Sequence, residues 1–272
     1  MELLRALNLF PAVGIMLFGV TLWRLLGIDA WHWAPYWLCG GLVVYNADRL
    51  RHDSADLHNN PARYQRQARY RLASTALAAG AGLALLLLPI AERDWAALAM
   101  VLGGSLGSLS YTFPLLGRRI KELPIFKSFF PPLAIAGAYM LLPLPAESPR
   151  LAWGHWWLLS AWALLVLSAN VILCDLRDIT GDRAAGVVTV PVACGIARTR
   201  QLLWAMLGLA ALAAWPLLHH LPGPTWAIPA TTFYLAIVLA AQPRWGHHDT
   251  FYELGADGFL FLAAALALLP WW

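Results

Sequence analysis

Charged residues are scarce in this sequence. Asp, Glu, Lys and Arg together make up 12% of the 272 residues, whereas 60% of the residues are hydrophobic. A soluble domain of this size carries about 25% charged residues, so the composition excludes an ordinary soluble fold. Long apolar runs that contain few charges predict an integral membrane protein with several spans.

Cysteine is also rare, with three residues at Cys39, Cys174 and Cys194. Their spacing matches neither a disulfide framework nor a zinc-binding motif, so we expect neither. We also expect no cleavable signal peptide, because Pro11 and Arg24 lie in or beside the first apolar run. No small-residue cleavage site follows that run.

Long apolar runs recur along the whole chain and predict nine transmembrane helices by length and hydropathy. The runs cover residues 7–28, 32–47, 72–91, 95–113, 124–143, 155–174, 202–221, 225–241 and 256–270. We therefore predict an all-α polytopic membrane protein that forms a single domain over residues 1–272.

The basic residues lie mostly on one side of this predicted topology. Of the 19 Lys and Arg residues, all except Arg24, Arg93 and Arg150 are assigned to one side: they fall at the N-terminus, in the 48–71, 117–123, 175–201 and 242–255 connections or, for Lys127, at the start of the 124–143 run. Cytoplasmic connections carry an excess of Lys and Arg, so this asymmetry predicts a cytoplasmic N-terminus. The long connections on that side also hold most of the acidic residues, which predicts a cytoplasmic active-site face.

Three carboxylates follow directly on the apolar run at 156–173. Asp175, Asp178 and Asp182 are spaced three and then four residues apart, which places them on one face of a helix. Like charges in this arrangement repel one another unless a positive group lies among them. Carboxylates without Cys or His partners are hard oxygen ligands, so the pattern predicts Mg²⁺, whose open positions take phosphate oxygens.

Another acidic cluster, the first one along the chain, follows the apolar run at 32–47. Asp48, His52 and Asp56 recur every four residues, and Asp53 and Asn46 share a neighbouring helix face. Both clusters lie at the predicted cytoplasmic ends of their helices. We expect them to face each other across a cavity and to hold two or three Mg²⁺ ions with a diphosphate.

The Asp175–Asp182 cluster and its flanks resemble the UbiA-type superfamily of intramembrane prenyltransferases. The stretch from Asp175 to Gly186, followed by Thr189, Pro191-Val192 and Gly195, is similar to the second aspartate-rich motif of that family. Tyr111 to Pro114, followed by Lys121 and Lys127, is similar to the family's Tyr-x-x-Pro…Lys stretch. The resemblance extends over nearly the whole chain.

This resemblance implies nine helices around a central, lipid-accessible cavity that binds a polyprenyl diphosphate through Mg²⁺. The diphosphate leaves, and a hydrophobic acceptor, often aromatic, captures the allylic cation. The first motif departs from the family pattern Asn-Asp-x-x-Asp-x-x-x-Asp. With a two-residue gap after Asn46, Asp48-Arg49 aligns with the middle Asp, and the third Asp falls on His52 with Asp53 beside it.

Together the residues and the resemblance predict three kinds of site residue. The predicted catalytic residues are Asp178, Asp182, Lys121 and Tyr111. The predicted substrate-binding residues are Lys127, Arg177, Arg183, Asn46 and Tyr45, where cations neutralise the diphosphate and aromatic faces stabilise the carbocation. The predicted metal ligands are Asp48, Asp53, Asp56, Asp175, Asp178 and Asp182.

Two further features have candidate roles. His247-His248-Asp249, followed by Tyr252, Glu253 and Asp257, is a candidate lid element or a base for the acceptor. Gly103, Gly104 and Gly107 form a small-residue stripe that predicts close helix packing.

Three functions remain open at this point. The first is a Mg²⁺-dependent prenyltransferase that acts on a prenyl diphosphate and a hydrophobic acceptor in the bilayer. The second is a cyclase or lyase that ionises the diphosphate and uses no acceptor. The third is a cation transporter or an inactive lipid-binding relative, but carboxylates at helix ends rather than at the bilayer midplane disfavour transport. No nucleic-acid partner is expected, and the oligomeric state is not predicted.

Overall fold

The structure is a computed structural model that describes residues 2–50, 61–114, 119–246 and 250–268. Within those ranges every regular element is a helix. The longer helices are α2 (Leu9–Leu25), α3 (Ala34–Leu50), α6 (Arg71–Glu92), α7 (Trp95–Thr112), α8 (Phe126–Leu141), α10 (Trp153–Ala184), α12 (Ile196–His220), α13 (Ala227–Trp245) and α14 (Gly258–Leu268). The shorter elements are α1 (Glu2–Ala6), η1 (Trp31–Trp33), α5 (Pro61–Arg69), η2 (Ile120–Glu122), α9 (Leu144–Glu147), η3 (Ser148–Arg150), α11 (Val190–Cys194) and η4 (Phe251–Ala256). The predicted all-α class is confirmed for this part of the chain.

Several of these helices are long and apolar enough to cross a membrane. In the described ranges, 4 segments meet this condition: Arg71–Glu92, Phe126–Arg150, Trp153–Ala184 and Val190–His220. Shorter apolar helices cover Leu9–Leu25 and Leu254–Leu268. The chain is therefore an integral membrane protein, and the count of nine spans and the cytoplasmic N-terminus remain predictions.

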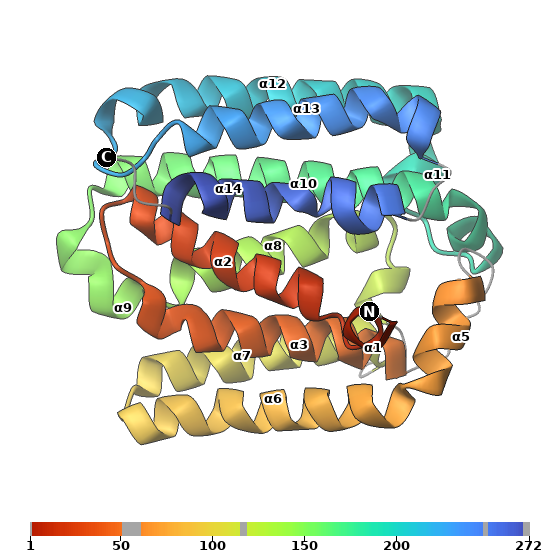
Figure 1. The fold of residues 1–272 in the computed structure, drawn as a ribbon, viewed down its shortest axis with the longest axis horizontal. Helices are drawn as coiled ribbons and strands as arrows, with labels where there is room; N and C mark the ends of the chain where they lie inside the picture. The colour runs from red at the N-terminus through yellow and green to blue at the C-terminus, as the bar shows by residue number, and fades with distance from the viewer. Residues whose placement is uncertain (1, 51–60, 115–118, 247–249, 269–272) are drawn as a thin grey trace.

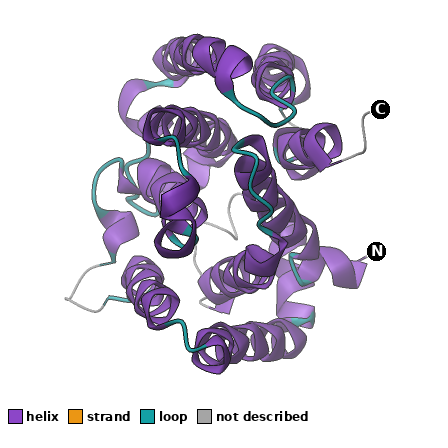
Figure 2. Ribbon diagram, turned by 90° about the vertical axis from the view of Figure 1, so that its left-hand side faces the viewer, coloured by secondary structure: helices purple, strands orange, loops and turns teal. Residues whose placement is uncertain are grey.

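The long helices run side by side along one direction (Figure 1), and Figure 2 shows many of them nearly end-on. Helix α10 lies in the middle of the bundle and packs against α8 and α12, while α3 packs against α2 and α6. The C-terminal ends of α3 and α10 lie at the same end of the bundle as the start of α8 (Figure 1). The fold thus brings α3 and α10, the helices that lead into the two acidic clusters, to the same end of the bundle.

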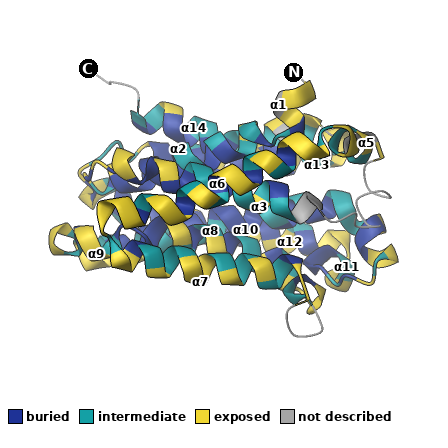
Figure 3. Cartoon of the chain, turned by 90° about the horizontal axis from the view of Figure 1, so that it is seen from below, coloured by how far each residue is buried: buried dark blue, intermediate teal, exposed yellow. Residues whose placement is uncertain are grey.

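Buried residues gather between the helices, whereas long exposed stripes run along α6 and α7 (Figure 3). The Trp23 indole N–H donates to the Tyr139 carbonyl oxygen at 2.8 Å, and the Tyr139 hydroxyl donates to the Ile15 carbonyl oxygen at 2.8 Å. A Cβ atom at Gly19 would lie 2.6 Å from the Trp37 ring, so only glycine leaves room for this contact. These contacts fix α2, α3 and α8 relative to one another.

The small-residue stripe on α7 does not produce the close packing that we predicted for it. A Cβ atom added at Gly103 or Gly104 would have no neighbour within 4 Å, and at Gly107 it would meet only an ordinary contact with Phe130 at 3.6 Å. The prediction was therefore wrong for Gly103 and Gly104. In the described bundle these glycines lie on an exposed surface of α7, where close backbone approach is not required.

Candidate functional site

Helix α10 carries three carboxylates beyond its apolar segment. It runs for 32 residues, and its last three turns contain Asp175, Asp178 and Asp182. The side chains of Asp175 and Asp182 are almost completely buried, with 4% and 1% of their residue surface exposed. Buried carboxylates destabilise a fold unless a cation or a hydrogen-bond donor compensates for them.

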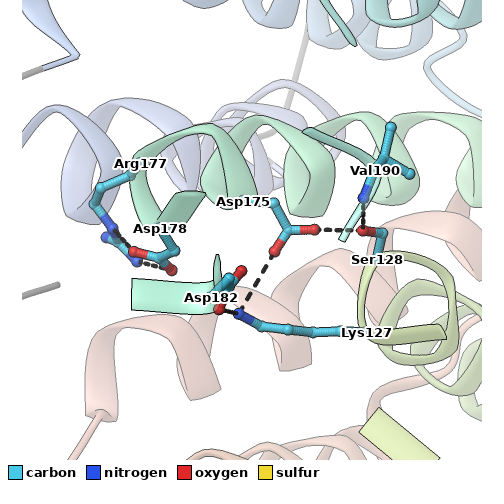
Figure 4. Close-up of polar contacts among 7 residues, drawn as sticks. All are labelled: Lys127, Ser128, Asp175, Arg177, Asp178, Asp182 and Val190. Atoms are coloured by element: carbon cyan, nitrogen blue, oxygen red, sulfur yellow. Dashed lines mark hydrogen bonds and ion pairs between the residues drawn. The ribbon is translucent and has the colours of Figure 1, made fainter. Parts of the chain in front are cut away.

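The first turn of α8 supplies this compensation. The Lys127 Nζ atom lies 2.5 Å from Asp182 Oδ1 and 3.9 Å from Asp175 Oδ1 (Figure 4). The neighbouring Ser128 hydroxyl donates a hydrogen bond to Asp175 Oδ2 at 2.6 Å. One ammonium group and one hydroxyl group from α8 therefore hold two carboxylates of α10.

The loop after α10 fixes this arrangement in place. Gly186 has a φ of 70°, a left-handed conformation that favours glycine, and the Val187 N–H returns to the Asp182 carbonyl oxygen at 2.8 Å. The loop then contacts the start of α8, because the Val190 N–H donates to Ser128 Oγ at 3.1 Å. This turn explains why a glycine follows the aspartate cluster at that distance.

Asp178 lies on the same end of α10 but has a different partner. The Arg177 Nε and Nη2 atoms donate to the two oxygens of the Asp178 carboxylate at 2.7 and 3.1 Å. Figure 4 shows this pair beside the Lys127 contacts rather than within them. The shared helix face that we predicted thus holds two carboxylates around Lys127 and a third one engaged by Arg177.

The site partly fits the predicted Mg²⁺ ions. Asp182 Oδ2 is buried and makes no hydrogen bond of regular geometry among the residues that the structure describes, and the Thr189 hydroxyl is a polar neighbour of this carboxylate. A buried carboxylate oxygen that lacks a well-formed hydrogen bond is a suitable ligand for a hard cation, and Asp175 adds a second oxygen donor. Within the described ranges no three His, Cys, Asp or Glu side chains converge closely enough to form a metal site by themselves. Further ligands would have to come from a bound phosphate or from residues outside those ranges.

Other predicted site residues lie around this cluster in different settings. Lys121 is buried on η2, with 7% of its surface exposed, and Arg183 is exposed at the end of α10. The Tyr111 ring stacks on the Phe130 ring with a centroid distance of 5.3 Å and an interplanar angle of 8°. Tyr45 is half-buried on α3. The structure therefore places Lys127 directly against the acidic cluster, whereas Lys121 and Tyr111 belong to the neighbouring η2 and α7.

Asn46 has a structural setting that the sequence did not indicate. Its side chain is fully buried, and its amide nitrogen donates to the Leu7 and Leu42 carbonyl oxygens at 3.1 and 2.8 Å. Its amide oxygen accepts a hydrogen bond from Asn8 at 3.0 Å. These contacts connect α3 to the start of α2, so the amide group is engaged within the protein in this structure.

The remaining candidates of the first cluster are Asp48, Asp53 and Asp56. Asp48 belongs to α3, and its side chain lies outside the described part of the structure. Asp53, Asp56 and the 247–249 stretch lie outside the described residues altogether. Their roles remain predictions.

Sequence reasoning missed Ser128 as a member of the site. Its hydroxyl accepts from the Val190 N–H and donates to Asp175, so it joins α8, the 187–190 loop and α10. The only signal in the sequence was its position directly after Lys127. A serine in that position has no pattern of its own, because its partner lies 47 residues away.

The fold and the site together define a class of protein. It is a helical membrane bundle in which buried carboxylates, paired with cations, lie at the end of a central helix. The family model of the UbiA prenyltransferase family matches residues 55–262. The chain belongs to this family. The matched range begins after Asn46 and Asp48, so it leaves out the first part of the degenerate acidic cluster.

Solved structures share this fold at low sequence identity. A structure of a UbiA homologue from Archaeoglobus fulgidus bound to GPP and Mg²⁺ has a TM-score of 0.56 and 16% identity, covering 99% of this chain and 100% of that chain. A digeranylgeranylglyceryl phosphate synthase structure has a TM-score of 0.55 and 16% identity, covering 98% of this chain and 94% of that chain. At these identities the likeness establishes the fold only.

A curated relative matches over a shorter stretch. Somaliensene A/B synthase of Streptomyces somaliensis is 44% identical over 80 residues, which are 28% of this chain and 27% of that protein. The match therefore spans about a quarter of that relative's length.

Proposed function

We propose that this protein transfers a prenyl group from a prenyl diphosphate to a hydrophobic acceptor inside the membrane, in a Mg²⁺-dependent reaction. The observation that carries the proposal is the Lys127 ammonium group between two buried carboxylates of α10. Buried ionisable groups in a membrane bundle are costly and mark functional sites. Family membership and the substrate-bound homologue from Archaeoglobus fulgidus support the same chemistry.

In this proposal Mg²⁺ is held by Asp175, Asp178 and Asp182 of α10, together with Asp48, Asp53 and Asp56 of the first cluster. When bound, Mg²⁺ neutralises negative charge on the diphosphate and makes it a better leaving group. The buried Asp182 oxygen that makes no hydrogen bond of regular geometry is the donor that supports this assignment most directly.

The chain itself supplies the remaining charge and the apolar surroundings. Lys127, Lys121, Arg177 and Arg183 contribute positive charge toward the diphosphate as the allylic C–O bond breaks and its electron pair leaves with the diphosphate. Tyr111 and Tyr45 offer aromatic faces to the allylic cation that remains. The Tyr111 ring is stacked on Phe130, and this contact restricts its orientation.

The reaction ends when a nucleophilic carbon or oxygen of the acceptor bonds to the allylic cation and a proton leaves the acceptor. Asn46 is proposed to support substrate binding indirectly, because its buried amide group holds the last turns of α3 against the start of α2. The proposal includes one domain over residues 1–272, nine spans, a central cavity, a cytoplasmic N-terminus and an active-site face on the cytoplasmic side. The uneven distribution of Lys and Arg supports this orientation.

The proposal is tested with purified protein in lipid nanodiscs. Geranyl, farnesyl and geranylgeranyl diphosphates are added with Mg²⁺ and a set of aromatic and lipid acceptors, and prenylated products are identified by mass spectrometry. We expect an acceptor-dependent product and diphosphate release that stops when EDTA removes Mg²⁺. Protein that neither binds nor consumes any prenyl diphosphate would overturn the proposal and leave an inactive lipid-binding role.

A second candidate function is an acceptor-independent terpene cyclase or lyase. The 44% identity to a stretch of Somaliensene A/B synthase favours this alternative. In a cyclase, a double bond of the substrate attacks the allylic cation, and loss of a proton or addition of water ends the reaction. Omitting the acceptor from the same experiment separates the two functions: a transferase forms no prenylated product, whereas a cyclase releases a hydrocarbon or an alcohol.

A further inference from the structure

The face of α10 that carries Arg177 contacts a part of the fold that has no role in the mechanism above. Arg177 follows Asp175 by two residues, so it points to nearly the opposite side of the helix. On that side lies η4 (Phe251–Ala256), a π-helical turn between α13 and α14. Short π-helical segments often occur at functional sites, because they redirect a side chain. The side chain of interest here is Tyr252, which is 2% exposed.

Tyr252 contacts the guanidinium group that binds Asp178. The Arg177 Cζ atom lies 5.1 Å from the centroid of the Tyr252 ring. The edge of the same guanidinium group donates two hydrogen bonds to the Asp178 carboxylate. A guanidinium group can stack on an aromatic ring with its face and bind a carboxylate with its edge at the same time. The two contacts are therefore compatible, and together they restrict the orientation of Arg177.

Tyr252 is itself held by residues from two other helices. The Gln242 side-chain N–H of α13 donates to the Tyr252 hydroxyl at 3.2 Å. The Gln242 side-chain oxygen accepts from the Arg200 Nε and Nη2 atoms of α12 at 3.2 and 2.6 Å. A Cβ atom at Gly246 would lie 2.9 Å from the Tyr252 hydroxyl oxygen and 2.8 Å from the Gln242 amide nitrogen. A glycine at this position therefore leaves the space that the contact requires.

We infer that Tyr252 is a positioning residue for Asp178, because it holds the Arg177 guanidinium group in register with the Asp178 carboxylate. The inference rests on the proposed function, in which Asp178 is a metal ligand. An arginine side chain that lacks its stacking partner samples many rotamers, and Asp178 would then lose its fixed orientation. Residues that orient a metal ligand typically change metal affinity by about 10–100-fold when they are replaced.

The test measures metal binding by the purified full chain and does not depend on turnover. EPR counts free Mn²⁺ in the presence of the protein, with and without inorganic diphosphate, against a protein-free reference. We expect Tyr252→Leu to weaken Mn²⁺ binding about tenfold. Tyr252→Phe keeps the stacked ring and should stay within about twofold of the unaltered protein. In an Arg177→Gln background, Tyr252→Leu should cause no further loss, because the group that Tyr252 positions is absent.

Any other result of the Mn²⁺ measurement shows whether the proposed function or the positioning role of Tyr252 is wrong. If the unaltered protein binds no Mn²⁺ with diphosphate, the proposed function and this inference both fail. If it binds Mn²⁺ and Tyr252→Leu binds it equally well, only the inference is overturned. A loss that persists unchanged in the Arg177→Gln background indicates a general packing role and also overturns it. If Tyr252→Leu does not fold, Tyr252→Met, which fills the space with a flexible apolar side chain and also removes the ring, carries the test: a several-fold loss supports the inference, and unchanged binding contradicts it.

Discussion

The α8-facing carboxylates of α10 and the neighbouring Asp178 receive their counter-ions in different ways. Asp175 and Asp182 share the Lys127 ammonium group, which comes from another helix. Asp178 binds Arg177, the residue directly before it in the chain. The first pair therefore depends on the tertiary structure, whereas the second contact is local and is reinforced by Tyr252. We expect substitutions at the Lys127 cluster to affect both folding and activity, and substitutions around Asp178 to affect mainly metal binding.

The largest effect is expected for Asp182→Asn. This change keeps the side-chain shape and removes a buried charge that is proposed to hold Mg²⁺. Turnover of a prenyl diphosphate should fall about 100-fold or more, the scale at which removal of one charge-stabilising group lowers turnover. Steady-state diphosphate release measures the effect, with exposed Asp29→Asn at the opposite end of the bundle as control. Wild-type turnover by the Asp182→Asn variant would contradict the metal assignment.

Lys127→Met should have the largest effect on folding. It leaves two buried carboxylates without their shared cation, and breaking a buried ion pair costs about 3–5 kcal/mol. The apparent melting temperature in detergent should fall. Added Mg²⁺ should raise the melting temperature of the Lys127→Met variant by more than it raises that of the unaltered protein, because the metal replaces the missing charge. Arg244→Met, on an exposed part of α13, is the matched control. An unchanged melting temperature for Lys127→Met would show that the ammonium group is not the counter-ion of the cluster.

Ser128→Ala should have an intermediate effect. It removes the donor to Asp175 and leaves a buried carboxylate oxygen and the Val190 N–H without that partner, at a cost of about 1–3 kcal/mol. Thermal unfolding measures the loss, and Ser110→Ala on α7 serves as control, because that hydroxyl donates to the Leu106 carbonyl oxygen of its own helix. Equal behaviour of the two alanine variants would show that Ser128 does not hold Asp175.

The smallest effect is expected for Gly186→Ala. The left-handed conformation of Gly186 disfavours a Cβ atom by roughly 1–2 kcal/mol. Gly104→Ala is the matched control, since it adds a Cβ into open space on a helix and should stabilise it by about 0.5–1 kcal/mol. Opposite signs in the two melting temperatures are expected. A stabilising Gly186→Ala would contradict the turn that joins α10 to the 187–190 loop.

Hydrophobicity and spacing predicted much of the fold and part of the site. Each predicted apolar segment overlaps a helix in the described part of the chain, because a segment that lies in lipid must satisfy its own backbone hydrogen bonds. The three- and four-residue spacing correctly placed Asp175 and Asp182 on one helix face. Family-like flanks also singled out Lys127, although we expected it to bind the substrate rather than to join these two carboxylates.

The remaining features depend on contacts between distant parts of the chain. Ser128 and Tyr252 are single polar residues in apolar or mixed surroundings, and their partners Asp175 and Arg177 lie on another helix. Periodicity within one helix carries no information about such partners. For the same reason, the sequence did not indicate that Asn46 holds α3 to the start of α2, or that Gly103 and Gly104 face open space.

The most direct test of the central claim is an experimental structure with Mn²⁺ and a non-reactive thio-analogue of geranyl diphosphate. We predict an anomalous Mn²⁺ signal next to Asp182 Oδ2, with the diphosphate between the ends of α10 and α3 and with Lys127 turned from the carboxylates toward the phosphates. An analogue bound elsewhere, with Lys127 still between Asp175 and Asp182 and no metal beside them, would contradict the account.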